Sequence, residues 1–184
     1  MSRCLESIIK HYKKNWGVSG TARVWDKGPR EELPEEFVVL EFAPTSKRSM
    51  WTYATACMSQ PDDESPIELH LFSPQSSQAH VELLTAIAHY HRHDAQLDLG
   101  HTVNFGRPWM PGSQCDHGLI SLPYLDGPDL ENLSLDDIAV RFLWLIPITK
   151  NELEYKKKNG LEALEEEFDK QKFNYLDPLR DSIV

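Results

Sequence analysis

The sequence predicts a single α+β domain that spans residues 1–184. In the first half of the chain, four runs rich in Val, Phe, Trp, Tyr and Leu alternate with segments of turn chemistry, which is typical of strands. Short connections suit antiparallel neighbours, because a parallel crossover needs about a dozen residues or more. A chain of 184 residues also has the usual size of one domain. The expected strands are 21–25, 37–42, 51–58 and 67–72.

Helices are predicted before and after these strands. The first covers about residues 4–16 and ends at Gly17, and the central one runs from about 76 to 93 with Ser76 or Ser77 as its N-cap. The first helix rests on apolar and aromatic residues at helical spacing, namely Leu5, Ile8, Ile9, Tyr12 and Trp16.

The second half of the chain supplies two further apolar runs, 118–122 and 138–148. The latter is the most hydrophobic stretch and reads as a central strand. Thr149 and Glu152 match a capping box, so a helix is expected immediately after the strand. Gly160, after Asn159, is the expected left-handed C-cap of that helix. A second helical stripe then follows at Leu161, Leu164 and Phe168.

Composition narrows the classes of partner. The chain has 19 Lys and Arg residues against 29 Asp and Glu residues, a net charge of −10, and a sequence pI near 5.2. Binding to a phosphate backbone needs a basic footprint, so we expect no direct nucleic-acid partner. No segment approaches the ~18 continuous apolar residues of a membrane span, and the N-terminus lacks the pattern of a signal peptide. The three cysteines fit neither a disulfide framework nor a metal motif, which predicts the reducing cytoplasm.

A histidine cluster in the central helix invites a metal hypothesis, because neutral imidazole is a common zinc ligand. Helical periodicity places His80 and His91 near the buried stripe, whereas His89 and His93 share the solvated face. The i, i+4 pair could bind a metal weakly, but the sequence shows no third ligand at fixed spacing. We therefore predict no metal and no cofactor.

Motifs for covalent catalysis are missing from the sequence. It contains no GxSxG elbow, HExxH motif or glycine-rich phosphate loop. Cys115, Asp116 and His117 are neighbours in sequence only, which does not make a nucleophile–base pair. Acidic runs such as 165–167 are interpreted as solvated helix faces. We expect a protein that is not an enzyme, with a histidine-dependent metal hydrolase as one alternative.

Two segments have the character of binding loops. Residues 101–112 mix aromatic residues, Arg107, Pro and Gly, which predicts a structured loop or edge strand. The alternative is that Phe105 and Trp109 cap the core below the loop. Residues 124–131 form a predicted turn with three carboxylates, either a plain acidic surface turn or a docking place for a basic partner.

These segments also carry a family resemblance. Several ordered motifs resemble the Suppressor of Fused (SUFU) domain family, in the form of a stand-alone bacterial-type member. The resemblance covers most of the chain and is strongest from about residue 80 onwards. Its motifs are 101–106, 119–124, 142–153, 155–161 and 175–178.

The resemblance implies an α/β sandwich whose mixed, mostly antiparallel sheet is flanked by helices, and a non-enzymatic protein-binding function. The animal members are larger regulators that sequester zinc-finger transcription factors, and the stand-alone bacterial members resemble immunity proteins against polymorphic toxins. In the animal branch, the end of the central helix and a later histidine segment hold the ligand, and Tyr90 and His101 fall at corresponding places. Gly100 replaces an acidic residue there, and Asp98 lies two residues earlier.

We therefore expect an immunity protein that binds a basic toxin domain, with aromatic and arginine anchors and acidic residues for steering. The alternative is a general adaptor that takes an extended peptide onto a strand edge or sequesters a signalling or transcription protein. The candidate partner-binding residues are Tyr90, Asp98, His101, Arg107, Trp109, Asp126, Asp129 and Glu131.

Overall fold

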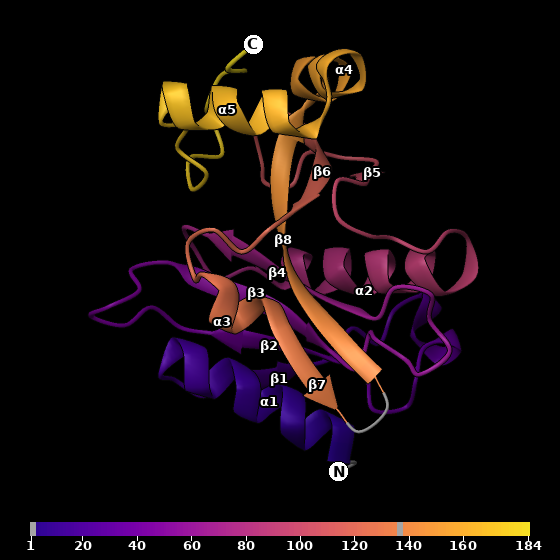
Figure 1. Cartoon of the computed structure of the whole chain (residues 1–184). Coiled ribbons are helices and arrows are strands. Elements are labelled where there is room, and N and C mark those ends of the chain that lie inside the picture. Colours follow the sequence, from indigo (N-terminus) through magenta and orange to yellow (C-terminus); the bar gives the residue numbers. More distant parts are fainter. Residues whose placement is uncertain (1–2, 136–137) are drawn as a thin grey trace.

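The computed structural model describes residues 3–135 and 138–184. Within these residues a mixed sheet lies between layers of helices, so the predicted α+β sandwich is confirmed (Figure 1). None of the described helices has the length and apolar character that crossing a membrane requires. The helices are α1 (Arg3–Trp16), the 3-10 helix η1 (Pro29–Glu32), α2 (Gln78–His93), α3 (Pro128–Glu131), α4 (Lys150–Asn159) and α5 (Leu161–Gln171).

The sheet follows the order β1-β2-β3-β4-β8-β6-β5, with β7 paired to β8 beside this path. Neighbouring strands are antiparallel except β4 and β8, which are parallel. The strands are β1 (Thr21–Arg23), β2 (Val38–Phe42), β3 (Trp51–Ala56), β4 (Ile67–Ser73), β5 (Thr102–Asn104), β6 (Cys115–Ser121), β7 (Asn132–Leu135) and β8 (Ile138–Thr149).

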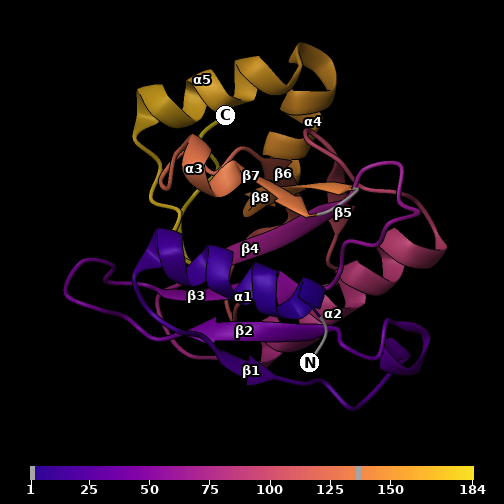
Figure 2. The same ribbon diagram turned by 60° about the horizontal axis from the view of Figure 1, so that its bottom comes forward.

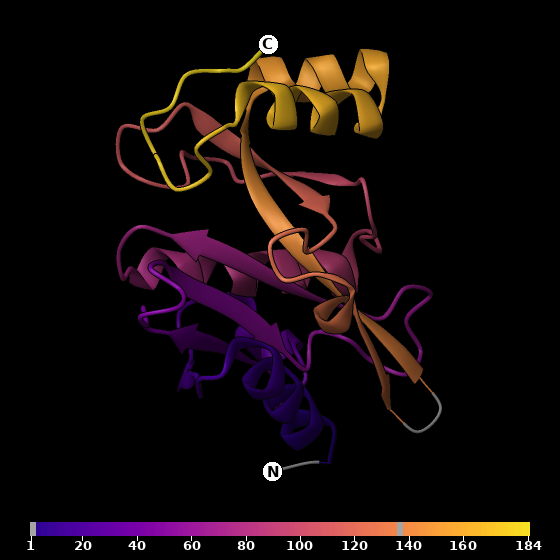
Figure 3. The ribbon, with the colours of Figure 1, turned by 60° about the vertical axis from the view of Figure 1, so that its left-hand side comes forward.

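The sheet divides the hydrophobic core into two sides, and the side chains of its central strand β8 contribute to both. Side chains alternate along a strand, and Leu143 and Leu145 pack into the core that also contains the buried residues of α2. Phe142 points to the opposite side, where it meets Tyr12 of α1. Trp144 lies on that same side but further along, with the buried residues of α5. Figure 2 shows α1 lying across the sheet in front and α2 behind it, and Figure 3 shows α4 and α5 packed side by side.

Most of the expected elements are confirmed within a few residues. Ser77 caps α2 by accepting a hydrogen bond from the Ala79 N–H, and Thr149 forms the predicted capping box with Glu152. One cap differs from the expectation. Gly160 has φ +96° and ψ 170°, so its φ is positive, as glycine allows, but its conformation is not the left-handed helical one, and α5 starts at the very next residue. Three short elements, η1, α3 and β7, were predicted only as turns or not at all.

A buried ion pair holds the C-terminal segment on the sheet. Glu152 accepts hydrogen bonds from Arg180 at 2.5 and 2.8 Å, and both side chains are buried. Arg180 also donates to the Pro147 carbonyl of β8 at 3.0 Å. The second carboxylate oxygen of Glu152 accepts from the Thr149 N–H of the capping box. One pair therefore joins β8, α4 and the tail.

The α1 side of the sheet also buries an imidazole. His70 on β4 is fully buried, and neither ring nitrogen has a hydrogen-bond partner among the described residues. The ring packs edge-on against Trp16 and beside Phe72, with ring centroids 5.7 and 5.2 Å apart. Burial and the nearby Arg48 guanidinium lower the pKa of His70 to about 3. Its folded form is therefore neutral throughout the ordinary pH range.

We predict that replacing His70 with Phe makes stability less dependent on pH. The unfolded chain takes up a proton on His70 below about pH 6.5, but the folded chain does not until about pH 3. His70 therefore lowers the free energy of unfolding by up to about 1.4 kcal/mol for each pH unit as pH falls across that window. Urea denaturation at several pH values between 7 and 4 gives the free energy of unfolding as a function of pH. In His70→Phe this free energy should fall less steeply with decreasing pH than in the wild type, by about the same amount per pH unit. An unchanged slope would contradict the assignment.

We further predict that Arg180→Ala destabilises the protein by about 3–5 kcal/mol, because it leaves the Glu152 carboxylate buried without its partner. Arg180→Lys should recover little of this loss, since an ammonium cannot make the two parallel hydrogen bonds and also reach Pro147. Denaturant unfolding measures both effects. If both variants stay within 1 kcal/mol of the wild type, on the order of a surface pair, the pair does not anchor the tail.

Candidate protein-binding surface

The segment 122–131 protrudes beside β8 for a reason that lies in the register. Trp144 of β8 pairs with Ser121, the last residue of β6, and Arg141 pairs with Asn132, the first residue of β7. Both strands thus lie on the same edge of β8, and the chain between them bulges outward. At the start of this bulge Tyr124 and Leu125 are 58% and 48% exposed.

A groove of about 580 Å³ opens between this segment and α5. Trp144 and Ile146 of β8 and Phe168 of α5 contribute apolar lining, and all three side chains are buried. We call it the acidic groove because four carboxylates line it against a single lysine, Lys172. The carboxylates are Glu162, Glu165, Glu166 and Asp169.

The helical period places these carboxylates together. Positions 162, 165, 166 and 169 follow the i, i+3, i+4, i+7 pattern, which lies on one face of a helix. Leu164 and Phe168 form the buried stripe that holds α5 on the sheet. One face of α5 therefore packs, and a neighbouring face carries negative charge into the groove.

Glu165 ties the protruding segment to α5. Its carboxylate accepts hydrogen bonds from the Ser121 hydroxyl at 2.5 Å and from the Tyr124 hydroxyl at 3.1 Å. Partial burial, followed by the charge and hydrogen bond of Glu165, raises the pKa of Tyr124 to about 12. Tyr124 therefore remains a neutral hydrogen-bond donor whose ring is held at the rim of the groove.

The remaining carboxylates differ in how much of their charge is available to a partner. Glu166 lies 3.6 Å from the Lys170 ammonium, so its charge is partly offset. Glu162 and Asp169 are exposed, and neither forms an ion pair within residues 3–135 and 138–184. Exposed apolar side chains next to uncompensated carboxylates suit a basic protein surface.

Three of the candidate residues predicted from the sequence come together near the groove. Arg141 forms an ion pair with Glu131 at 2.8 Å and approaches Asp98 at 3.5 Å. The backbone N–H of Asp98 donates to Nδ1 of the exposed His101 at 3.2 Å. We call Asp98, His101 and Glu131 the loop patch.

The loop patch adjoins the acidic groove through β6. The Ile120 N–H donates to the His101 carbonyl at 2.9 Å, and the Gly100 N–H donates to the Ile120 carbonyl at 2.8 Å. The next residue, Ser121, donates to Glu165 in the groove. The patch and the groove are therefore neighbours along one strand.

Two candidates are not exposed, which corrects their expected role as contact residues. Trp109 is only 5% exposed and stacks on His80 with ring centroids 5.6 Å apart, so it caps the core as the alternative interpretation held. The Asp126 side chain is also 5% exposed because it turns inward to pair with Arg48. Burial removes both from the surface that a partner reaches.

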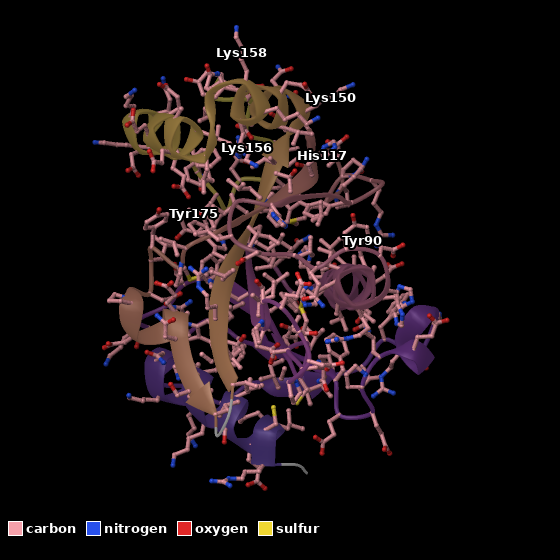
Figure 4. The ribbon with its side chains drawn as sticks, turned by 45° about the vertical axis from the view of Figure 1, so that its right-hand side comes forward. Tyr90, His117, Lys150, Lys156, Lys158 and Tyr175 are labelled. Atoms are coloured by element: carbon pink, nitrogen blue, oxygen red, sulfur yellow. The ribbon has the colours of Figure 1, made fainter. Side chains whose placement is uncertain are left out.

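The other three candidates stay at the surface but are dispersed. Asp129 is exposed on α3. Arg107 is half-exposed and pairs with Glu82 of α2. Tyr90 is 43% exposed in the last turn of α2, and in Figure 4 it lies on the other side of β8 from Tyr175, which lines the acidic groove.

The α5 carboxylates are not among the binding residues predicted from the sequence. Their i, i+3, i+4, i+7 spacing was visible beside the apolar stripe, but the same spacing describes any solvated helix face. Tyr124 and Leu125 belong to the turn predicted at 124–131, and nothing in the sequence signals that both are exposed.

Among residues 3–135 and 138–184, one group of side chains could hold a metal ion. His80 and His91 are buried, and His89 and His93 share the outer face of α2, as predicted. The structure adds Glu32 from η1, so that ligand atoms of Glu32, His89 and His93 lie within 4.8 Å of one another.

The fold and its surface define an α+β sandwich domain with an exposed acidic groove, and the comparisons with known proteins agree on one family. The family model for Suppressor of fused protein (SUFU) matches residues 34–181. A crystal structure of a SUFU homolog from Neisseria gonorrhoeae FA 1090 is similar with a TM-score of 0.86 and 33% sequence identity, over 98% of this chain and 97% of that one. The chain therefore belongs to the Suppressor of Fused family.

More distant structures share the fold. A crystal structure of the Sufu-Fu complex matches with a TM-score of 0.72 and 13% identity, over 98% of this chain and 92% of that one. Drosophila Suppressor of Fused matches with a TM-score of 0.71 and 14% identity. This chain covers 98% of its own length but only 51% of the Drosophila chain. A search of curated proteins finds no match.

Proposed function

We propose that this chain is a non-enzymatic protein-binding domain that receives a basic protein on the acidic groove and the adjoining loop patch. We further propose that it acts in the cytoplasm as an immunity protein, whose partner is a toxin domain. The observation that carries the proposal is the exposure of Tyr124 and Leu125 on the side of the groove that faces the carboxylates of α5.

The two kinds of residue in the groove serve different steps of binding. Most of the affinity of a protein interface comes from a few anchors, and large side chains that enter pockets on the partner are typical of them. Tyr124 and Leu125 are placed to do this, and Glu165 orients the Tyr124 ring beforehand, which reduces the entropy lost on binding. Carboxylates mainly accelerate encounter and reject partners of the wrong charge.

The charge of the whole chain supports a toxin that acts on an anionic substrate. A net charge of −10 attracts a basic surface at long range. A nuclease has such a surface, because it must bind phosphates. An acidic inhibitor seated there would occupy the place of the substrate, so neutralisation needs no chemistry from this chain.

The second candidate function is an adaptor that adds a peptide strand to a sheet edge. The described edge strands, β1, β5 and β7, have only three, three and four residues, and all three residues of β1 are exposed. So short an edge offers few backbone hydrogen bonds, which favours the groove over strand addition. The relative solved as the Sufu-Fu complex supports a protein partner in either case.

The test begins with recovery of the partner by pull-down from the native organism and its co-expression with this chain. We predict that the partner inhibits growth when expressed alone and that this chain restores growth. Tyr124→Ala should weaken the measured affinity about 30-fold or more, the effect of losing an anchor worth about 2 kcal/mol. Tyr90→Ala is the matched control, because it removes an exposed tyrosine on the α2 side of the sheet.

The electrostatic part of the proposal has its own control. Glu162→Gln with Asp169→Asn should slow association and make the rate less sensitive to salt, with a smaller effect on dissociation. Asp26→Asn with Glu35→Gln removes the same charge from exposed positions outside the groove. Equal effects of the two pairs would place binding elsewhere. A partner without toxicity would support the adaptor instead.

A further inference from the structure

We propose that Glu32, His89 and His93 form a zinc-binding site on the outer face of α2. The two imidazoles come from one helix and the carboxylate from η1, more than fifty residues away in the chain. The inference does not depend on the proposed function, because the site is built from other residues and faces another side of the sheet.

The positions of the three side chains follow from local structure. His89 and His93 are separated by one helical turn, and their ring centroids lie 4.4 Å apart. The buried residues of α2, such as Leu84 and Ile87, hold the opposite face of the helix on the sheet. Leu33 is buried in the same core and anchors the chain directly after Glu32.

The distances between ligand atoms fit a tetrahedral ion. With nitrogen and oxygen ligands about 2.0–2.1 Å from zinc, two ligand atoms lie roughly 3.3 Å apart. The Glu32 carboxylate oxygen Oε2 is 2.8 Å from Nε2 of His89 and 3.8 Å from Nε2 of His93. These values lie on either side of the required spacing. Nε2 of His93 also lies 3.0 Å from the Glu32 carbonyl oxygen, so metal binding requires the His93 ring to turn from that carbonyl toward the carboxylate.

The donor set selects the kind of metal. Two imidazoles and one carboxylate suit zinc and its neighbours, whereas magnesium and calcium require mostly oxygen ligands. Arg92, between the two histidines in sequence, does not oppose the cation because its guanidinium is directed to Asp63 and the Met58 carbonyl. Three protein ligands leave a fourth position for water or for a group from another molecule.

The test is a titration of the untagged full chain with Co²⁺, whose absorption reports tetrahedral coordination, followed by competition with Zn²⁺. We expect one equivalent to bind and each of His89→Ala, His93→Ala and Glu32→Gln to weaken binding about tenfold or more. His101→Ala is the matched control, since it removes an exposed histidine outside the site and should leave binding unchanged. Zn²⁺ should also raise the Tm of the wild type and of His101→Ala, but not of His89→Ala.

Three results would overturn the site. They are the absence of saturable binding, equal binding by the three variants and the wild type, and a thiolate-to-cobalt charge-transfer band, which would assign the ion to a cysteine. All three replaced side chains reach the surface, so the variants should fold, and circular dichroism checks this. The growth assay with the toxin tests the proposed function, and the metal titration tests the zinc site. If the zinc-site variants lose metal binding but still restore growth, the zinc site is supported and the proposed function is unaffected, so the two hypotheses can fail separately.

Discussion

Strand β8 is hydrogen-bonded on both edges and packed on both faces, and every other layer is placed relative to it. Its alternating side chains send Leu143 and Leu145 toward α2, and Phe142 and Trp144 toward α1 and α5. A shift of one residue in its register would exchange these two sets, which differ in size and polarity of surroundings. The same register fixes where β6 ends and β7 begins, and therefore where Tyr124 and Leu125 emerge.

Polar groups on the α1 and α5 side of the sheet limit the alternatives further. Glu68, on β4, is fully buried and accepts hydrogen bonds from Thr55 and from both the hydroxyl and the backbone N–H of Ser59. The buried Glu152–Arg180 ion pair, with the bond from Arg180 to the Pro147 carbonyl, likewise satisfies the polar groups buried where the C-terminal tail meets β8. Buried polar networks add little net stability compared with apolar packing. An alternative fold that buries one of these charges without its partner is less stable, however, by roughly 3–5 kcal/mol for a broken buried ion pair. They therefore favour one arrangement over its competitors.

Local sequence patterns predicted the regular elements well, because periodicity and caps act over a few residues. The capping box at Thr149 and the stripe of Leu164 and Phe168 are examples. The sites were less predictable, because they combine distant segments. Nothing in the sequence places Glu32 beside His89, and the inward turn of Asp126 depends on Arg48, 78 residues earlier. Trp109 shows a further limit, since an aromatic residue in a loop can serve a core or an interface equally well.

The two proposed sites lie on opposite faces of the sheet, and this bears on how they could act together. The acidic groove belongs to the layer of α5, and the proposed zinc site belongs to α2. A partner on the groove would leave the zinc site accessible, so metal binding should not compete with it. Coupling would have to pass through β8, whose two faces are rigidly packed against both layers. A rigid strand transmits little unless it has two arrangements, so the simplest expectation is that the sites are independent.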